Sequence, residues 1–193
     1  AINAGADIDP ATGIASVSMQ YAEVSNLYDF ILDRLRSYYE DRGFNAQQFD
    51  AVAALRPASL TDFDARLKAL GAFAKLPEAA ALAAANKRAR NILRKAEGEV
   101  PDTVDPSLFA EEAERALADA LHAALADTDA ALASRDYVAV LSRLATLRPG
   151  VDAFFDQVMV NADDPRVRGN RLALLKKLAD RLGSVAAIEH LSA

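Results

Sequence analysis

The sequence predicts an all-α protein, because its composition and its hydrophobic periodicity both indicate helices. Hydrophobic residues, mostly Ala, make up 52% of the 193 residues, whereas Gly (8) and Pro (7) are scarce. An Ala-rich, Gly-poor chain forms helices at low entropic cost. No run of β-branched and aromatic residues alternates with the period of two that marks a strand. Apolar residues recur at spacings of three and four instead, so we expect a bundle of about eight helices.

Four helices are expected in the N-terminal half. The first runs over residues 24–42, stops at Gly43, and carries an apolar stripe of Leu27, Ile31, Leu35 and Tyr38. The second runs over residues 46–55 and ends because the residue before Pro57 avoids helical angles. The third starts near Thr61. The fourth begins at Pro77, a residue suited to the first helical position, and runs to Ala96.

The C-terminal half is expected to begin with a loop, residues 98–107, that contains two prolines. A long helix over residues 108–133 follows, and a helix capped by Asp136 then runs to Leu147, ended by Pro149. Further helices are predicted over residues 151–160 and from Asp164-Pro165 to Gly183, with a short turn over 185–191. Residues 1–22 contain few large apolar groups, and we expect a lead-in or linker there that need not be ordered. The helical domain is predicted over residues 23–193.

Several classes of protein are excluded by what the sequence lacks. There is no cysteine, so disulfides and thiolate sites are excluded, and a reducing compartment such as the cytoplasm is expected. No apolar run is long enough for a membrane span, and no signal peptide opens the chain. The first residue is Ala rather than Met, so we expect a processed form or an excised fragment.

No pattern of catalytic residues is found either. His122 and His190 have no ligand-like partner at helical spacing, and no glycine-rich phosphate-binding motif occurs. Paired aspartates such as Asp163 and Asp164 can hold Mg²⁺. A metal-dependent enzyme is therefore a hypothesis too, weaker than the RNA-binding and protein-docking hypotheses given below. No third carboxylate completes the motif, and Asp164 is better explained as a helix cap before Pro165. We predict no catalytic residue, metal site or cofactor in this chain.

The charges are distributed unevenly along a chain whose net charge is −6. The stretch from residue 97 to residue 129, here called the acidic belt, carries ten acids and one base. The first basic segment, residues 87–95, holds five bases and no acid. The second basic segment, residues 166–181, carries Arg166, Arg168, Asn170, Arg171, Lys176, Lys177 and Arg181. Surface fields depend on such clusters rather than on net charge.

These clusters leave two readings open. Arg and Lys neutralise phosphates, and Arg and Asn can read base edges, which favours RNA binding. Basic residues late in a helix also complement its dipole, so a helical docking module that never touches RNA fits equally well. The two readings differ in a testable way. Basic segments that converge on one exposed face favour RNA, and segments that are salt-bridged to the acidic belt favour docking.

A family resemblance appears in two long blocks. Residues 151–165 contain the ungapped run Phe-Phe-Asp-Gln-Val-Met-Val-Asn-Ala over residues 154–162, and residues 85–93 read Ala-Asn-Lys-Arg-Ala-Arg-Asn-Ile-Leu. Residues 30–36, and Asp62 to Arg66 with Lys68, match as well. Together they resemble the C-terminal anticodon-binding domain of the bacterial-type glycyl-tRNA synthetase β subunit, which is related to that of arginyl-tRNA synthetase. The tetrapeptide DALR, which names the wider superfamily, does not occur as such.

The resemblance, which covers residues 24–191, implies a DALR-type fold and a role in binding the anticodon region of glycine tRNA. It implies that the chain is not an enzyme by itself, whereas its parent attaches glycine to tRNA with ATP and Mg²⁺. The rest of the β subunit and the α subunit would then be partners, with neither DNA nor a membrane involved.

Glycine anticodons share two cytosines, which Asn, Arg and carboxylate groups can read once the bases are unstacked. We therefore expect the RNA-binding residues to come from the two basic segments and from the loop before the second. They are Lys87, Arg90, Asn91, Arg94, Asn161, Arg166, Arg168 and Asn170. Phe154, Phe155 and Met159 are expected to lie in the core.

Overall fold

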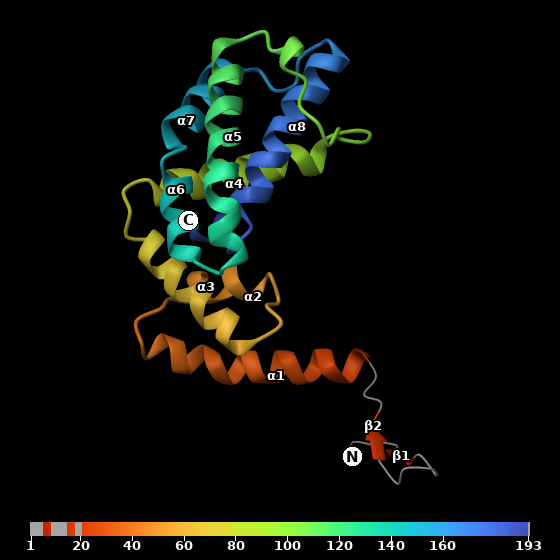
Figure 1. Ribbon diagram of the computed structural model, residues 1–193, viewed down its shortest axis with the longest axis vertical. Helices are drawn as coiled ribbons and strands as arrows, with labels where there is room; N and C mark the ends of the chain where they lie inside the picture. The colour runs from red at the N-terminus through yellow and green to blue at the C-terminus, as the bar shows by residue number, and fades with distance from the viewer. Residues whose placement is uncertain (1–5, 9–14, 18–20, 193) are drawn as a thin grey trace. The chain divides into compact units, whose positions relative to one another are not determined.

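The computed structural model describes residues 6–8, 15–17 and 21–192, with side chains from residue 27 onward. This part of the chain forms eight α-helices, two short 3-10 helices and two three-residue strands (Figure 1). In chain order the elements are β1 (Ala6–Ile8), β2 (Ala15–Val17), α1 (Tyr21–Glu40), α2 (Ala46–Ala53), α3 (Leu60–Phe73), α4 (Ala79–Lys95), η1 (Pro106–Leu108), α5 (Glu112–Ala133), α6 (Tyr137–Ala145), α7 (Arg148–Gln157), α8 (Pro165–Leu182) and η2 (Ile188–Leu191).

The chain divides into two compact units, residues 1–43 and residues 44–193. In the first unit β1 and β2 pair antiparallel, with Ala6 opposite Val17 and Ile8 opposite Ala15. Strands of three residues are too short to show a period of two, so the sequence did not predict them. Most of the predicted lead-in, residues 1–22, lies outside the described residues, and its boundary stays a prediction.

Helix α1 occurs where the first helix was expected, but the predicted apolar stripe was misplaced. Leu32 and Tyr39 are buried, whereas Leu27 is 49% exposed and Tyr38 is 46% exposed. Apolar residues lie on both sides of this helix, so spacing alone could not decide which side is covered.

The second unit confirms the all-α class. Helix α2 begins at a capping box in which Asn45 and Gln48 exchange hydrogen bonds through their side chains and backbone amides. Asp136 caps α6 and Asp164 caps α8, as predicted. None of the described helices combines the length and the apolar character that crossing a membrane requires.

Several predicted boundaries are wrong by a few residues; for example, the helix predicted over residues 151–160 is α7, which ends at Gln157. The fourth helix begins at Ala79 rather than at Pro77. The long helix α5 begins at Glu112, because Leu108 belongs to η1, whose first turn is capped by the Asp105 carboxylate. Pro149 lies in the first turn of α7 instead of ending the helix before it. Proline is tolerated there because the first amides of a helix have no intrahelical partner.

Helix α4 packs against α7, α8 and η2, and α5 packs against α6, α7 and α8. Figure 1 shows α4 running across α8 in this unit. The core of the second unit is apolar, and among its fully buried side chains are Phe49 of α2, Phe63 and Phe73 of α3, and Phe154 of α7. The helices therefore hold one another through side chains from several elements rather than through neighbours in sequence.

A buried ion pair joins α5 to α8. Glu114 is 1% exposed and Arg171 is 6% exposed, and Nε and Nη2 of Arg171 donate to the two carboxylate oxygens at 2.9 and 3.0 Å. Burial by itself would raise the pKa of Glu114, but hydrogen bonds from Arg171 and from the Glu111 and Ala110 amides hold that pKa below its usual value. Nη1 of Arg171 also donates to the Met159 carbonyl at 2.8 Å.

A second polar network ties α3 to α6 and to the chain after α8. Arg66 donates to Asp62 at 2.8 Å and to the carbonyls of Ser184 and Val185, and its guanidinium lies over the Tyr137 ring. Burial opposes ionisation of Asp62, yet hydrogen bonds from Tyr137 and Arg66 leave its pKa lowered. The Asp62–Arg66 motif quoted for the family resemblance therefore has a structural role here.

Candidate nucleic-acid interface

The first basic segment forms the outer face of α4. Small residues pack its inner face, where Leu82, Ala83 and Ala89 are fully buried. The outer face, here called the α4 face, consists of Lys87, Arg88, Asn91, Arg94 and Lys95, all of which are exposed. Residues three and four apart share one side of a helix, so this spacing keeps the five side chains together.

A hollow of about 330 Å³ lies on the α4 face, lined by Ala84, Lys87, Arg88, Asn91, Ile92 and Lys95. The lining therefore consists of apolar, amide and basic side chains. None of the ion pairs between described residues involves Lys87, Arg88 or Lys95. Uncompensated cations around an apolar floor favour an anionic ligand that carries a flat apolar group.

Two contacts orient the polar groups of the hollow. The guanidinium of Arg88 lies over the Phe155 ring of α7, 4.4 Å from its centroid. Arg94 donates through Nη2 to Oδ1 of Asn91 at 3.0 Å. Sequence reasoning did not select Arg88 as a site residue and assigned Phe155 to the core. The signal it missed is that residue 88 lies one turn from Asn91 and Ile92 on the same face.

Arg90, a predicted contact, is instead held by the protein. Its Nε lies 3.0 Å from Oε1 of Glu189 in η2, and its Nη2 donates to the Ala179 carbonyl at 3.2 Å. The neighbouring Asn86 is fully buried and donates to the same Glu189 carboxylate at 2.8 Å. Arg90 therefore joins α4 to α8 and η2 at the edge of the α4 face.

The predicted residues of the second basic segment differ in exposure. Arg166 and Asn161 are exposed, and Arg168 is half-buried and donates to the Ala162 carbonyl at 2.8 Å. Asn170 is 4% exposed, and its amide accepts from the Asp105 amide at 2.7 Å and donates to the Asp105 carbonyl at 3.0 Å. Asn170 thus anchors the loop before η1, and an RNA contact by its side chain stays a prediction.

The later bases of this segment are paired with the acidic belt. Arg171 pairs with Glu114, Lys176 with Asp102 and Arg181 with Asp129. They do not decorate a free surface, as the sequence suggested, because α5 and the preceding loop lie against α8. Because salt bridges to the acidic belt favour protein docking, these pairs weaken the case for RNA binding by the second basic segment. Among the described residues, the α4 face carries no such pairs.

The RNA-binding candidates of the first basic segment do not lie close to those at the start of the second. Arg90 reaches α8 at Ala179, thirteen residues beyond Arg166. That separation corresponds to roughly 20 Å along a helix axis. The α4 face is therefore a separate surface from the start of α8.

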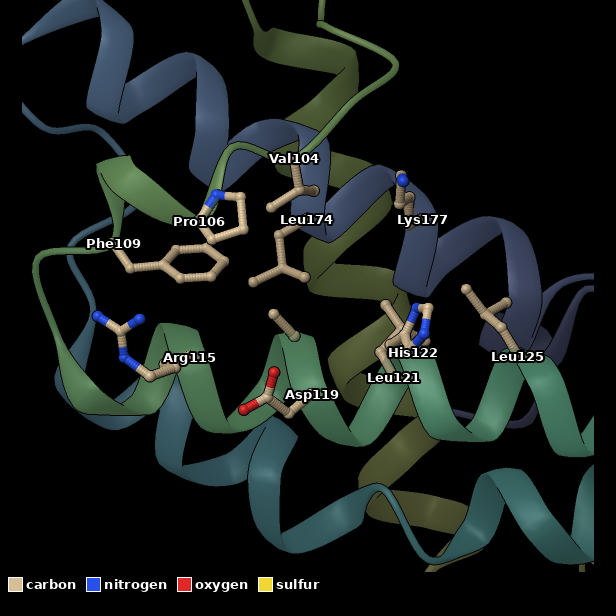
Figure 2. A pocket seen from close by; sticks show the side chains of 11 residues that line it. Val104, Pro106, Phe109, Arg115, Asp119, Leu121, His122, Leu125, Leu174 and Lys177 are labelled. Atoms are coloured by element: carbon tan, nitrogen blue, oxygen red, sulfur yellow. The ribbon is translucent and has the colours of Figure 1, made fainter.

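A second hollow, of about 340 Å³, lies between the η1 loop, α5 and α8. Figure 2 shows Leu174 projecting from α8 between Arg115 on one side and His122 on the other, with Leu125 beyond His122. Its lining also includes Asp119 and His122, and it lies within the acidic belt. This mixed charge suits a polyanion less well than the α4 face does.

The metal-site hypothesis receives no support from the residues that the structure describes. Among them, no group of three His, Asp or Glu side chains is close enough to hold an ion. Asp164 uses its carboxylate to cap α8 through the Arg166 and Val167 amides.

The expectation that three side chains of the 151–165 block lie in the core was partly wrong. Phe154 is fully buried and Phe155 is half-buried, but Met159 is 75% exposed. The chain leaves the helical conformation at Val158, and Val158 and Val160 turn inward. Met159 between them consequently points outward.

The comparisons with known proteins agree with this arrangement. Residues 82–188 match the family described as the DALR anticodon binding domain. The chain is 70% identical over 168 residues to the glycine–tRNA ligase β subunit of Xanthomonas campestris strain 8004, a match covering 87% of this chain and 24% of that protein. It is 56% identical over 171 residues to the one from Xylella fastidiosa strain M12, covering 89% and 24%. The identity to the Pseudomonas aeruginosa LESB58 protein is 48% over 189 residues, covering 94% and 28%.

The exposed bases of α4 on an all-helical unit suit the binding of a polyanion, and the family match makes the class specific. The chain belongs to the DALR anticodon-binding domain family. It spans about a quarter of the length of the relatives it matches.

Proposed function

We propose that this chain binds the anticodon region of glycine tRNA as part of a glycine–tRNA ligase β subunit. The observation that carries the proposal is the α4 face, where four exposed bases surround Asn91 within the segment matched by the family. Lys87 and Lys95 contact backbone phosphates in this scheme, and Asn91, held by Arg94, faces a base. Asn161, Arg166 and Arg168 form a second, subsidiary contact at the start of α8.

The remaining parts of the proposal concern the whole protein. ATP-dependent attachment of glycine, with ATP and Mg²⁺, takes place outside this chain, which contributes tRNA recognition only. The rest of the β subunit and the α subunit are the protein partners, and the assembly works in the cytoplasm. The names of the relatives, glycine–tRNA ligase β subunit, support the part of this assignment that concerns attachment of glycine to tRNA.

The test is binding of a fluorescent glycine tRNA to the full chain over a range of salt concentrations. Each lost phosphate contact reduces the slope of log affinity against log salt by about 0.7 for single-stranded RNA. Replacing both Lys87 and Lys95 by Ala is therefore expected to reduce the slope by about 1.4. Lys75→Ala removes an equally exposed lysine outside the α4 face and is expected to leave the slope unchanged.

A second tRNA, with both anticodon cytosines replaced, separates recognition from general attraction. Weaker binding of this tRNA supports anticodon recognition, and equal binding reduces the role to backbone attraction. Absence of binding to either tRNA at low salt would favour the docking alternative instead.

A further inference from the structure

We infer that the hollow on the α4 face is a socket for one unstacked nucleobase, with Arg88 as its stacking platform and Asn91 as the reader of an acceptor edge. The inference rests on the proposed function and adds which residues meet the base and what chemistry they select. Its starting point is that Arg88 and Asn91 line one hollow with Ala84 and Ile92.

Arg88 is held in a manner that suits stacking. The Arg88 guanidinium carbon lies over the Phe155 ring, 4.4 Å from its centroid, so the ring restrains the position of the planar group. Arg88 is nevertheless exposed and lines the hollow, so its guanidinium remains accessible to a ligand. Unstacked RNA bases commonly stack on arginine guanidinium planes. Ala84 and Ile92 supply the apolar surface beside this platform.

Asn91 is oriented by Arg94. A guanidinium has only donors, so the group that faces Arg94 at 3.0 Å must be the Asn91 carbonyl oxygen. The amide NH₂ is then the free end, and no acceptor among the described side chains takes its hydrogens. Arg94 itself does not line the hollow. Asn91 therefore presents donors to a ligand, and the socket selects a base edge that accepts.

This geometry distinguishes cytosine from uracil. Cytosine N3 accepts a hydrogen bond, whereas uracil N3 carries a hydrogen, so an amide donor placed against N3 pairs with cytosine and meets a donor in uracil. Uracil accepts only through O2 and O4, on either side of N3. A donating amide consequently favours cytosine, the base that glycine anticodons share. Lys87 and Lys95 at the rim attract the flanking phosphates irrespective of the base.

The experiment uses the full chain and a glycine anticodon stem-loop RNA, with versions in which each anticodon cytosine is replaced by uridine. Arg88→Lys keeps the charge but removes the planar group, so affinity for the cytosine RNA should fall about tenfold at an unchanged salt slope. Asn91→Asp replaces donors by acceptors and should abolish the preference for cytosine over uridine. Circular dichroism and thermal unfolding verify that the variants fold.

Matched controls are available elsewhere in the chain. Arg115→Lys changes another arginine that lies over a phenylalanine ring, Phe109, and Gln47→Glu adds the same negative charge at an exposed amide. Both should bind as the parent does. If Arg88→Lys loses no more than Arg115→Lys, or if Asn91→Asp keeps the cytosine preference, the socket is refuted. Failure of the parent chain to bind any of the RNAs would refute the proposed function as well.

Discussion

At the scale of single residues, burial decides what a charged side chain does. Arg171 and Arg166 lie five residues apart on α8, yet Arg171 is 6% exposed and Arg166 is exposed. The guanidinium of Arg171 donates hydrogen bonds to Glu114 and to the Met159 carbonyl. A basic residue can thus be exposed and available to RNA, or paired inside the core, depending on which residues surround it in the folded protein.

Glu114→Gln is expected to destabilise the protein by about 3–5 kcal/mol, because it leaves the Arg171 charge buried without its counterion. The measurement is urea unfolding followed by circular dichroism at neutral pH. Lys68→Ala provides the comparison, since its pair with Asp64 is largely exposed and should contribute about 0–1 kcal/mol. Equal losses in the two variants would show that burial does not set the strength of the Glu114–Arg171 pair.

The same carboxylate makes stability depend on pH. The pKa of Glu114 is lowered in the folded protein, so in acid the unfolded chain binds the proton first. Its contribution is therefore complete above the ordinary glutamate pKa of about 4.5 and is lost as pH falls through the folded value. The stability difference between the parent and Glu114→Gln should shrink progressively as the pH falls below about 4.5 in urea titrations. A difference that stays constant would contradict the lowered pKa.

At the scale of elements, η2 is fastened to α4 by one carboxylate. Glu189 meets both Asn86 and Arg90, and Arg90 passes close to Gly183 at the end of α8. A Cβ at position 183 would overlap Nη2 of Arg90. The glycine therefore leaves room for the Arg90 guanidinium, whereas its φ of −82° is one that other residues also adopt.

Gly183→Ala should destabilise the protein by about 1–3 kcal/mol, because Arg90 must leave Glu189 and the Ala179 carbonyl. Thermal unfolding provides the measurement. In an Arg90→Ala background the same change should cost little, since the overlapping group is gone. Gly150→Ala is the control, because its Cβ would lie 3.8 Å from Leu117 in ordinary contact. Additive losses in the double variant would exclude this account of Gly183.

At the scale of the whole molecule, the chain consists of two compact units, and the α4 face belongs to the second. The family match, residues 82–188, also lies within it. We expect residues 44–193 alone to unfold cooperatively and to bind glycine tRNA with the affinity of the full chain. Calorimetry and tRNA titration of this fragment test the expectation. A fragment that folds but binds at least tenfold more weakly would place RNA contacts in residues 1–43.

The helices and their caps were largely predictable because they depend on local chemistry. Asp136 and Asp164 begin helices through bonds to amides two or three residues away, and Gly43 has the positive φ that its position after a helix suggested. Pro149 shows the limit of such signals. A proline can end one helix or open the next, and the residues around it do not distinguish the two.

The sequence by itself determined the all-α class, most helix positions, and the basic character of α4, since each follows from contacts within a few residues. The family blocks were also visible in it. Only the tertiary structure decided which of the basic residues are free. Two of the predicted basic residues are paired with acids: Arg171 binds Glu114, and Arg90 lies against Glu189. The side chain of Asn170 is bonded to the backbone of Asp105. These partners lie 57 to 99 residues away in sequence. No local sequence pattern predicts these pairings, because they form only when α8 packs against α5 and α4.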